Sequence, residues 1–180
     1  MSVFFTSDLH FGHKNLIEGL RKMTVEESDN LIISNWNKIV HKKDIVYVLG
    51  DITMEKPKLI EQYLKQLNGI IRIVGGNHDT IKCCEVFQNL QIPIMGVLNY
   101  KGFICTHIPV HPSQIEGFRG NIHGHIHLSG EIEGLGKYNP SELKGKYYNV
   151  NIEFHNYKPI LFENIKQYFE NYEIYSNRMA

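Results

Sequence analysis

This sequence has no surplus of either charge and no long hydrophobic run. Its 180 residues include 19 basic and 19 acidic side chains, and the formal net charge is zero. Proteins that hold nucleic acid by general electrostatic attraction carry a basic excess, so we expect no strong non-specific nucleic-acid binding. No stretch approaches the roughly 18 apolar residues typical of a transmembrane helix. The N-terminus shows no basic leader followed by an apolar stretch, so we expect neither a signal peptide nor a membrane partner.

Cysteine is scarce, and its spacing argues against a disulfide framework. The three cysteines are Cys83, Cys84 and Cys105, and two of them are adjacent. Secreted disulfide-rich domains carry even numbers of cysteines at regular spacings, and zinc sites often use a Cys-x-x-Cys pair that this chain lacks. We therefore expect ordinary free thiols in a protein of the reducing cytoplasm.

Length and composition suit one folded domain. Apolar residues make up 42% of the chain and charged residues 21%, as in a folded soluble protein. A chain of this length can bury a sizeable core but is short for two ordinary domains. It contains no internal repeat, low-complexity tract or Pro/Gly-rich linker, so we expect a single domain over residues 1–180.

Strand and helix signals alternate early in the chain, and strands crowd later. Apolar runs, typical of strands buried on both faces, occur at residues 3–6, 45–49 and 70–74. Thr24 and Glu27 have the spacing of a capping box, which predicts a helix from there to about residue 40. Further expected elements are helices from residue 14, over 57–68 and over 163–172, a hairpin of 94–98 with 103–106, and a strand over 147–152. This order favours an α/β fold of mixed sheets covered by helices.

Eight of the ten histidines fall in or beside four short clusters, which is the first sign of metal chemistry. Polar residues also follow directly after the expected strands: Asp8 and His10 after the first, Asp51 after the second, and Asn77 and His78 after the third. Ligand sites in open α/β sheets lie at the carboxyl ends of strands. We therefore expect these side chains to converge.

Each early cluster also has a plain structural interpretation. Asp8-Leu9-His10 can direct a carboxylate and an imidazole to one side of an extended segment, but Asp8 could instead cap a helix. Gly50-Asp51 follows a buried strand, where an unpaired carboxylate is costly, and a carboxylate can bridge two cations about 3.5–4 Å apart. A helix N-cap is the alternative for Asp51, but the next helix is expected only from Pro57. Gly75-Gly76-Asn77-His78-Asp79 offers an amide oxygen and an imidazole, yet would also suit an ordinary turn.

The second half of the chain adds further imidazoles. His107 follows the expected hairpin, and Gly124-His125-Ile126-His127 contains a His-x-His pair, which suits zinc, iron and related ions. Histidines satisfied within the core are the alternative. Structural zinc sites favour thiolates, so a mixed set of carboxylate, amide and imidazole groups, large enough for two ions, indicates a dinuclear hydrolase.

Five short blocks follow one another along the chain: Asp8-x-His10, Gly50-Asp51, Gly76-Asn77-His78-Asp79, His107 and Gly124-His125-x-His127. Together and in this order they resemble the sequence blocks of the calcineurin-like metallophosphoesterases. Residues 7–15, 35–37, 121–127, 149–151 and 157–159 further resemble a small bacterial and phage subgroup. The resemblance implies a four-layer α/β/β/α sandwich with two mixed β-sheets. It also implies a phosphoester hydrolase with two divalent transition-metal ions (manganese, iron, zinc or nickel) and a metal-bridging hydroxide.

Carried over residue by residue, the resemblance implies a role for each site residue. Seven would bind metal: Asp8, His10 and His127 the first ion, Asn77, His107 and His125 the second, and Asp51 both. His78 would be the general acid or a phosphate contact, oriented by Asp79. The candidate substrate contacts are His13, Arg21, His111 and His123. His111 also rivals His107 as a ligand; we prefer His107 because it directly follows a strand.

The expected substrate is a small or nucleotide-type phosphodiester, because the short chain has no inserted cap and no basic run suited to duplex DNA. A phosphomonoesterase or protein-phosphatase-like enzyme is the alternative. A non-catalytic scaffold of the same fold would usually lack a ligand or the acid histidine, and none is missing here. A β-lactamase-like enzyme would continue its His-x-His pair with Asp and His, where this chain has Leu128-Ser129-Gly130. Many relatives carry another acidic residue after the Gly-Asp block, where this chain has Ile52-Thr53-Met54.

Overall fold

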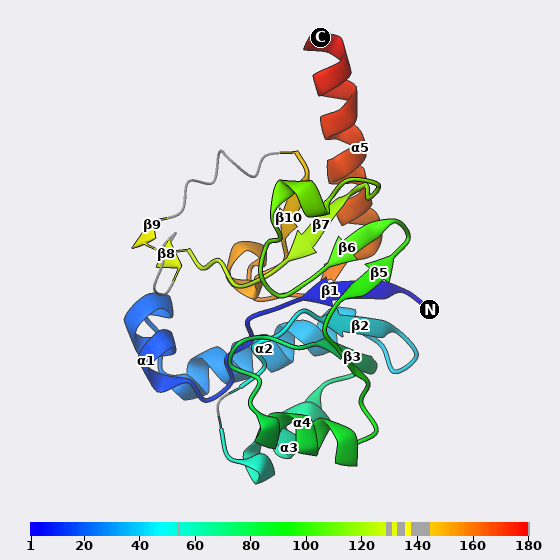
Figure 1. Ribbon diagram of the computed structural model, residues 1–180. Helices are drawn as coiled ribbons and strands as arrows, with labels where there is room; N and C mark the ends of the chain where they lie inside the picture. The colour runs from blue at the N-terminus through cyan, green and yellow to red at the C-terminus, as the bar shows by residue number, and fades with distance from the viewer. Residues whose placement is uncertain (54, 129–130, 133–135, 138–144, 180) are drawn as a thin grey trace.

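Two mixed β-sheets form the centre of the molecule (Figure 1). The computed structural model describes residues 1–53, 55–128, 131–132, 136–137 and 145–179. In the first sheet the strand order is β11-β1-β2-β3-β4, with β1 to β4 parallel and β11 antiparallel to β1. Its strands are β1 (Val3–Thr6), β2 (Ile45–Val48), β3 (Ile70–Val74), β4 (Ile94–Met95) and β11 (Ile160–Leu161).

The second sheet has the order β10-β7-β6-β5. Strands β10, β7 and β6 run parallel, and β5 pairs antiparallel with β6. Its strands are β5 (Leu98–Tyr100), β6 (Phe103–Cys105), β7 (Gly120–His123) and β10 (Tyr147–Asn149). A separate ribbon pairs β8 (Glu131–Ile132) with β9 (Gly136–Lys137).

Helices pack against both sheets. Figure 1 shows α2, α3 and α4 on the side of the first sheet that faces away from the second, and α5 beside the second sheet. Phe162, Ile165 and Phe169 of α5 join the core that lies between the sheets. The helical segments are α1 (Lys14–Leu16), a π-helical turn (Ile17–Arg21), α2 (Val25–Ile39), α3 (Pro57–Gln66), α4 (Ile81–Asn89), α5 (Phe162–Met179) and 3-10 turns at Pro112–Gln114 and Ile152–His155. This arrangement confirms the expected α/β/β/α layers. Within the described ranges, every helix is too short or too polar to cross a bilayer.

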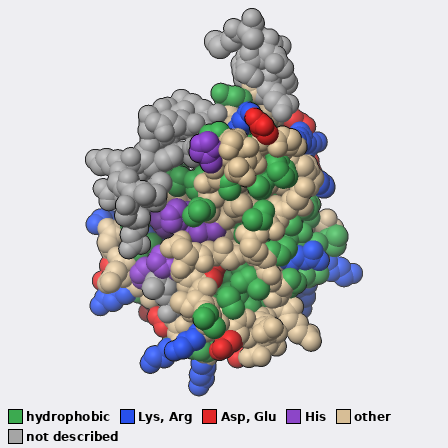
Figure 2. All heavy atoms as spheres, in the orientation of Figure 1, with side chains coloured by type: hydrophobic (Ala, Val, Ile, Leu, Met, Phe, Trp, Pro, Cys, Tyr) green, Lys and Arg blue, Asp and Glu red, His purple; other side chains and the backbone are tan. Residues whose placement is uncertain are grey.

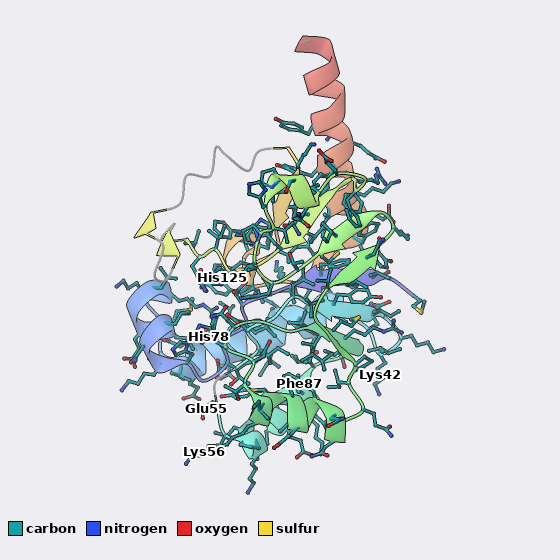
Figure 3. All side chains as sticks on the ribbon, viewed as in Figure 1. Lys42, Glu55, Lys56, His78, Phe87 and His125 are labelled. Carbon is teal, nitrogen blue, oxygen red and sulfur yellow. The ribbon has the colours of Figure 1, made fainter. Side chains whose placement is uncertain are left out.

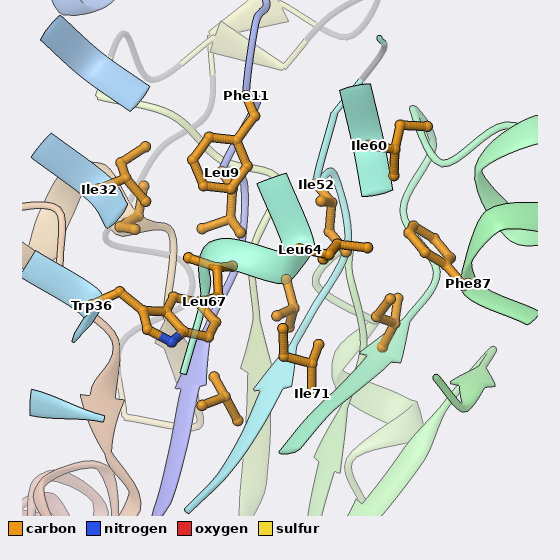
Figure 4. Packing of buried hydrophobic residues seen from close by; sticks show 14 of the residues in the cluster. Leu9, Phe11, Ile32, Trp36, Ile52, Ile60, Leu64, Leu67, Ile71 and Phe87 are labelled. Carbon is orange, nitrogen blue, oxygen red and sulfur yellow. The ribbon is translucent and has the colours of Figure 1, made fainter. Parts of the chain in front are cut away.

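Alternate residues of the central strands face two separate cores. In β1, Phe4 packs on the helix side and Phe5 packs between the sheets. In β2, Val46 and Val48 join the helix-side core, shown in Figure 4, whereas Tyr47 faces the second sheet. Because successive side chains of a strand point to opposite faces, a strand covered on both sides must be apolar throughout. The apolar runs in the sequence therefore predicted these strands correctly.

The predicted helix over α2 is also confirmed, with its cap. Thr24 Oγ1 accepts a hydrogen bond from Glu27 N–H at 3.2 Å, and the Glu27 carboxylate accepts one from Thr24 N–H at 2.8 Å. The two bonds satisfy amide groups that no helical carbonyl can reach.

The expected hairpin arm over residues 94–98 is wrong. Ile94–Met95 pairs with β3 of the first sheet, whereas Leu98–Tyr100 pairs with β6 of the second. The chain passes from one sheet to the other at Gly96 and Val97, so two short strands replace one continuous arm.

The strand expected over residues 147–152 is shorter than predicted. It ends at Asn149, and Ile152 begins a 3-10 turn. The Asn151 side chain caps this turn by accepting a hydrogen bond from Glu153 N–H at 2.9 Å. Asparagine readily supplies such local hydrogen bonds, which compete with strand pairing.

Candidate metal centre

The loops that follow five strands meet at one end of the two sheets. Asp8 and His10 follow β1, Asp51 follows β2, Asn77 and His78 follow β3, His107 follows β6, and His125 and His127 follow β7. Backbone hydrogen bonds join these loops, from Asp8 N–H to Gly50 O at 3.0 Å and from Gly124 N–H to His107 O at 2.8 Å. Histidine side chains gather on the face shown in Figure 2, and Figure 3 shows His78 and His125 on the same side of the molecule.

Six of the predicted ligands form two groups that could each hold a metal ion. One group is Asp8, His10 and His127, and the other is Asp51, His107 and His125. Within each group the three potential ligand atoms lie within 4.8 Å of one another. The groups agree with the division between two ions that the sequence resemblance implied, while binding itself stays a prediction.

Asp51 lies between the two groups. Its Oδ2 is 3.2 Å from His107 Nε2 in its own group and 3.7 Å from His10 Nε2 in the other. Asn77 completes this region, because its Oδ1 lies 2.8 Å from the same His107 nitrogen. A carboxylate so placed can reach cations on both sides.

The backbone at the ligands is held in an uncommon conformation. Asp8, His10, Asp51 and His125 have φ angles of 56°, 47°, 57° and 70°. Non-glycine residues seldom adopt positive φ, and each instance costs about 1–3 kcal/mol that surrounding contacts must offset. At these residues the chain turns sharply just after the strands end, which keeps the ligand side chains close to one another.

A glycine next to the ligands allows the loops to approach closely. A side chain at Gly76 would collide with the carboxylate and amide of Asp51. This close packing explains why the Gly-rich run follows β3 at this point.

Two imidazoles are oriented by bonds to the nitrogen that faces away from the site. His107 Nδ1 lies 2.8 Å from Leu49 O, and His127 Nδ1 lies 2.9 Å from Glu153 Oε1. When Nδ1–H donates to an oxygen, Nε2 keeps its lone pair for a metal. His107 Nε2 lies 3.2 Å from Asp51 Oδ2 and His127 Nε2 lies 3.8 Å from Asp8 Oδ1, so both rings are directed suitably for coordination.

The charges of the site are strongly coupled. Burial raises the pKa of Asp8 to about 6, although the charges of His107 and His127 oppose this rise. Burial also opposes ionisation of Asp51, but the hydrogen bond and charge of His107 outweigh it and lower the pKa of Asp51 to about 2. Burial acts likewise against the charge of His107, yet Asp51 and Asp8 raise its pKa to about 9. The buried carboxylates need a nearby positive charge, which a protonated His107 or a metal cation supplies.

One buried atom tests whether the residues fit a metal. Among the described residues, His10 Nε2 has no hydrogen-bond partner, although it is buried 3.9 Å from Asp8 Oδ1 and 3.7 Å from Asp51 Oδ2. A buried polar atom without a partner costs about 1–3 kcal/mol. A cation between this nitrogen and the two carboxylates removes that cost, so the donor set fits the metal that the sequence implied.

His78 lies at the rim of the site. Its side chain is 24% exposed, and its Nε2 is 4.0 Å from Asp51 Oδ2. The backbone N–H of His78 donates to Asp51 Oδ1 at 2.9 Å, which fixes the residue beside the second group. Its ring is therefore accessible to a substrate bound in this site.

The Asp79 carboxylate joins two loops of the site. It accepts hydrogen bonds from the backbone N–H groups of Gly76 (2.8 Å), Asp51 (3.0 Å) and Ile52 (3.2 Å). Its two oxygens therefore hold the backbones of two loops together, and its expected action on the His78 ring stays a prediction.

The four expected substrate contacts lie in different surroundings. His13 is at the site, with its Nδ1 3.3 Å from His10 Nδ1. His123 is buried and bonded through Nδ1 to Gly124 O at 2.8 Å, and burial lowers its pKa to about 4. This burial does not favour a substrate contact by His123, which stays a prediction. His111 is exposed, with its Nδ1 2.9 Å from Ser113 Oγ, and its contact with substrate stays a prediction.

Arg21 is buried beside the first ligand group. Its side chain is 0% exposed, and its guanidinium donates to Glu153 Oε1 at 3.1 Å, Leu9 O at 2.9 Å and Asp8 O at 2.7 Å. These bonds support the loop that carries Asp8. The expected contact of Arg21 with substrate stays a prediction, and these bonds do not favour it.

Glu153 is a residue of the site that sequence analysis missed. It is buried, and its carboxylate accepts hydrogen bonds from His127 Nδ1 at 2.9 Å, Arg21 Nε at 3.1 Å and Leu128 N–H at 3.3 Å. Burial opposes its ionisation, but His127 and Arg21 hold its pKa below the usual range. The signal available was a lone acidic residue between Ile152 and Phe154, directly after the Asn149-Val150-Asn151 segment.

Comparisons with known proteins agree with this geometry. An uncharacterized protein of Methanocaldococcus jannaschii is 35% identical over 174 residues, which cover 93% of this chain and 91% of that protein. The Gene 66 protein of Mycobacterium phage L5 is 40% identical over 83 residues, or 43% of this chain and 40% of that protein. A crystal structure of a protein of unknown function from Aquifex aeolicus matches with a TM-score of 0.72 and 25% identity, over 92% of this chain and 98% of that one.

The sequence profile of the calcineurin-like phosphoesterases matches residues 1–175, which is nearly the whole chain. Together with the two mixed sheets and the two candidate ligand groups, this match shows that the chain belongs to the calcineurin-like phosphoesterase family.

Proposed function

We propose that this protein is a phosphodiesterase that hydrolyses small or nucleotide-type phosphodiesters with two divalent transition-metal ions. Asp8, His10 and His127 would hold one ion, Asn77, His107 and His125 the other, and Asp51 both. When bound, such ions supply Lewis-acid chemistry and lower the pKa of water. The observation that carries the proposal is the Asp51 carboxylate, whose Oδ2 lies 3.2 Å from His107 Nε2 in one group and 3.7 Å from His10 Nε2 in the other.

The remaining residues would bind the substrate and move the proton. His78 is partly exposed at the rim, so we assign it the proton donated to the departing oxygen. Its ring centroid lies 5.4 Å from that of His10 and 6.1 Å from that of His13, and we propose that the leaving group binds beside these three rings. Asp79 would keep the loops of Asp51 and Gly76 in register through its three backbone hydrogen bonds.

Charge favours a diester over a monoester. A phosphomonoester carries nearly two negative charges at pH 7, because its second pKa is about 6, whereas a diester carries one. Of the described arginines and lysines, Arg21 alone makes side-chain hydrogen bonds to the loops of the site, and its donors are engaged by Glu153 and backbone carbonyls. A singly charged diester needs less neutralisation of its negative charge by cationic side chains than a monoester does, which supports the proposal.

The test compares two nitrophenyl substrates on the manganese-supplemented protein. We expect faster release of nitrophenol from bis(4-nitrophenyl) phosphate than from 4-nitrophenyl phosphate. A faster monoester reaction would make the protein a phosphomonoesterase, and no hydrolysis of either substrate with bound metal would refute the enzyme assignment.

Two variants test the roles of the residues. Asp51→Ala should lose metal and activity together, measured by metal analysis and by nitrophenol release. His78→Ala should keep its metal but lose about 10²–10⁴-fold in rate on alkyl esters, whose poor leaving groups need a proton. Normal rates of His78→Ala on an alkyl ester would contradict the acid role, and an active, metal-replete Asp51→Ala protein would contradict the bridging role.

A further inference from the structure

A groove lies beside the second ligand group and shares His107 with it. Its volume is about 330 Å³, and its lining includes Asn77, Gly96, Val97, His107, Ile108 and Val110. Asn77 and His107 are also candidate ligands of the second ion. The groove therefore opens directly from the place where a phosphate group would be held.

The exposed surface of the groove is mainly apolar. Val97 is 57% exposed and Ile108 is 52% exposed, and they line the same groove. Apart from His107, no titratable side chain is among the lining residues. Apolar side chains grouped beside a few directed polar atoms are typical of a small-molecule site, whereas a charged substituent would find no partner among them.

The wall that carries Ile108 and Val110 is braced from behind. Asn121 is completely buried, and its Oδ1 accepts a hydrogen bond from Val110 N–H at 3.0 Å. The Asn121 amide nitrogen donates to Thr106 Oγ1 at 3.0 Å, and Tyr147 Oη–H donates to Val110 O at 2.8 Å. These bonds from β7 and β10 fix the loop after β6, so the groove is formed before any ligand arrives.

The opposite wall contains a glycine that the backbone does not require. A Cβ at Gly96 would meet nothing within 4 Å, and Gly96 is not among the glycines with positive φ. Most residues could therefore occupy this position without strain. Because Gly96 lines the groove, we infer that a larger side chain there would narrow it.

We propose that this groove binds an uncharged aromatic substituent, of the size of a phenyl ring or a nucleobase, that stays on phosphorus during hydrolysis. The inference rests on the phosphodiesterase function proposed above and adds the preferred class of diester. A volume of about 330 Å³ lies at the lower end of small-molecule pockets and suits one ring system. The groove is lined by Asn77 and His107, whereas the rings of His10 and His13 near His78 are not among its lining residues, so we assign the groove to the substituent that stays on phosphorus.

The test uses two diesters that share one leaving group. Methyl 4-nitrophenyl phosphate and phenyl 4-nitrophenyl phosphate release the same nitrophenol, so their kcat/KM values differ through the retained substituent. We expect the phenyl ester to be favoured about tenfold, mainly through a lower KM, because the open groove covers part of one ring. Gly96→Val fills the groove, and Ile108→Asp places a charge in it; each should bring the phenyl-to-methyl ratio close to one.

A matched variant and a binding measurement separate the possible failures. Ile70→Ala is the matched control, because Ile70 is similarly exposed (47%) but lies at the start of β3, whereas the site follows the end of that strand. The Ile70→Ala variant should keep the tenfold preference for the phenyl ester. Calorimetric titration of metal-supplemented protein should show phenylphosphonate binding more tightly than methylphosphonate, with the difference lost in Gly96→Val. Equal affinities and equal KM values would overturn the groove assignment while hydrolysis continued. Tighter phenylphosphonate binding without any hydrolysis would instead overturn the proposed reaction and keep the groove.

Discussion

Removing the Glu153 carboxylate should affect metal binding and stability by separate routes. The carboxylate accepts hydrogen bonds from His127 Nδ1 at 2.9 Å and Leu128 N–H at 3.3 Å, and it forms an ion pair with Arg21 Nε at 3.1 Å. Both side chains of the ion pair are 0% exposed. Glu153→Ala therefore leaves one buried charge unpaired and one candidate ligand without its orienting partner.

The two effects can be estimated separately. Breaking a buried ion pair by removing one partner costs about 3–5 kcal/mol, which should appear as a loss in the free energy of unfolding of the metal-free protein. Loss of the carboxylate that orients a ligating histidine typically weakens metal binding by about 10–100-fold. That factor corresponds to about 1.4–2.8 kcal/mol.

Urea unfolding of metal-free protein and calorimetric titration with manganese measure the two effects. Glu153→Gln keeps the size of the side chain and should show smaller losses in both. Arg21→Met combined with Glu153→Gln removes both charges and should recover part of the stability but not the metal affinity. Glu116→Ala, which removes an exposed acidic side chain, serves as the control. If Glu153→Ala keeps wild-type metal affinity and stays within about 0.5 kcal/mol of wild-type stability, the positioning role of Glu153 is refuted.

Three further predictions concern the loops, the buried carboxylate and the helix cap. Gly76→Ala should abolish metal binding and lower the free energy of unfolding by about 1–3 kcal/mol, because its Cβ would collide with Asp51. The control is Gly19→Ala, whose Cβ would meet nothing within 4 Å; it should bind metal in the same titration and be no less stable than wild type. Burial raises the pKa of Asp8 to about 6 from 3.8, so its contribution to metal-free stability should fall by about 2–3 kcal/mol as pH rises from about 4 to 6. Asp8→Asn should flatten that part of the pH profile in urea unfolding, and an unchanged profile would contradict the shifted pKa. Thr24→Ala should lower the free energy of unfolding by about 1 kcal/mol, with activity as the unaffected control.

The predictable parts of the fold are those with a local signal. The run at residues 45–49 is apolar throughout because Val46 and Tyr47 face different cores, and this pattern is readable without the fold. Helix α4 was not predicted, although Cys83, Val86 and Phe87 are buried at helical spacing. Its N-cap Thr80 makes no side-chain cap bond, so the usual start signal was weak.

The sequence by itself determined the family, the layers and the residue types at the ends of the strands. These are properties of short segments: Asp51 directly follows β2, and the His125/His127 pair follows β7, whatever surrounds them. Only the tertiary structure decided how the ligands are supported. It brought His107 into the second group and left His111 exposed.

The supporting contacts could not be read from the chain because they join distant segments. Arg21 and Glu153 are separated by 132 positions, and Glu153 lies 26 positions after His127. Hydrophobic periodicity reports only which face of an element is buried. The sequence around a charged residue does not indicate which residue it will pair with. The tertiary structure places the 3-10 turn at Ile152–His155 beside the ligand loops, so Glu153 contacts both His127 and Arg21.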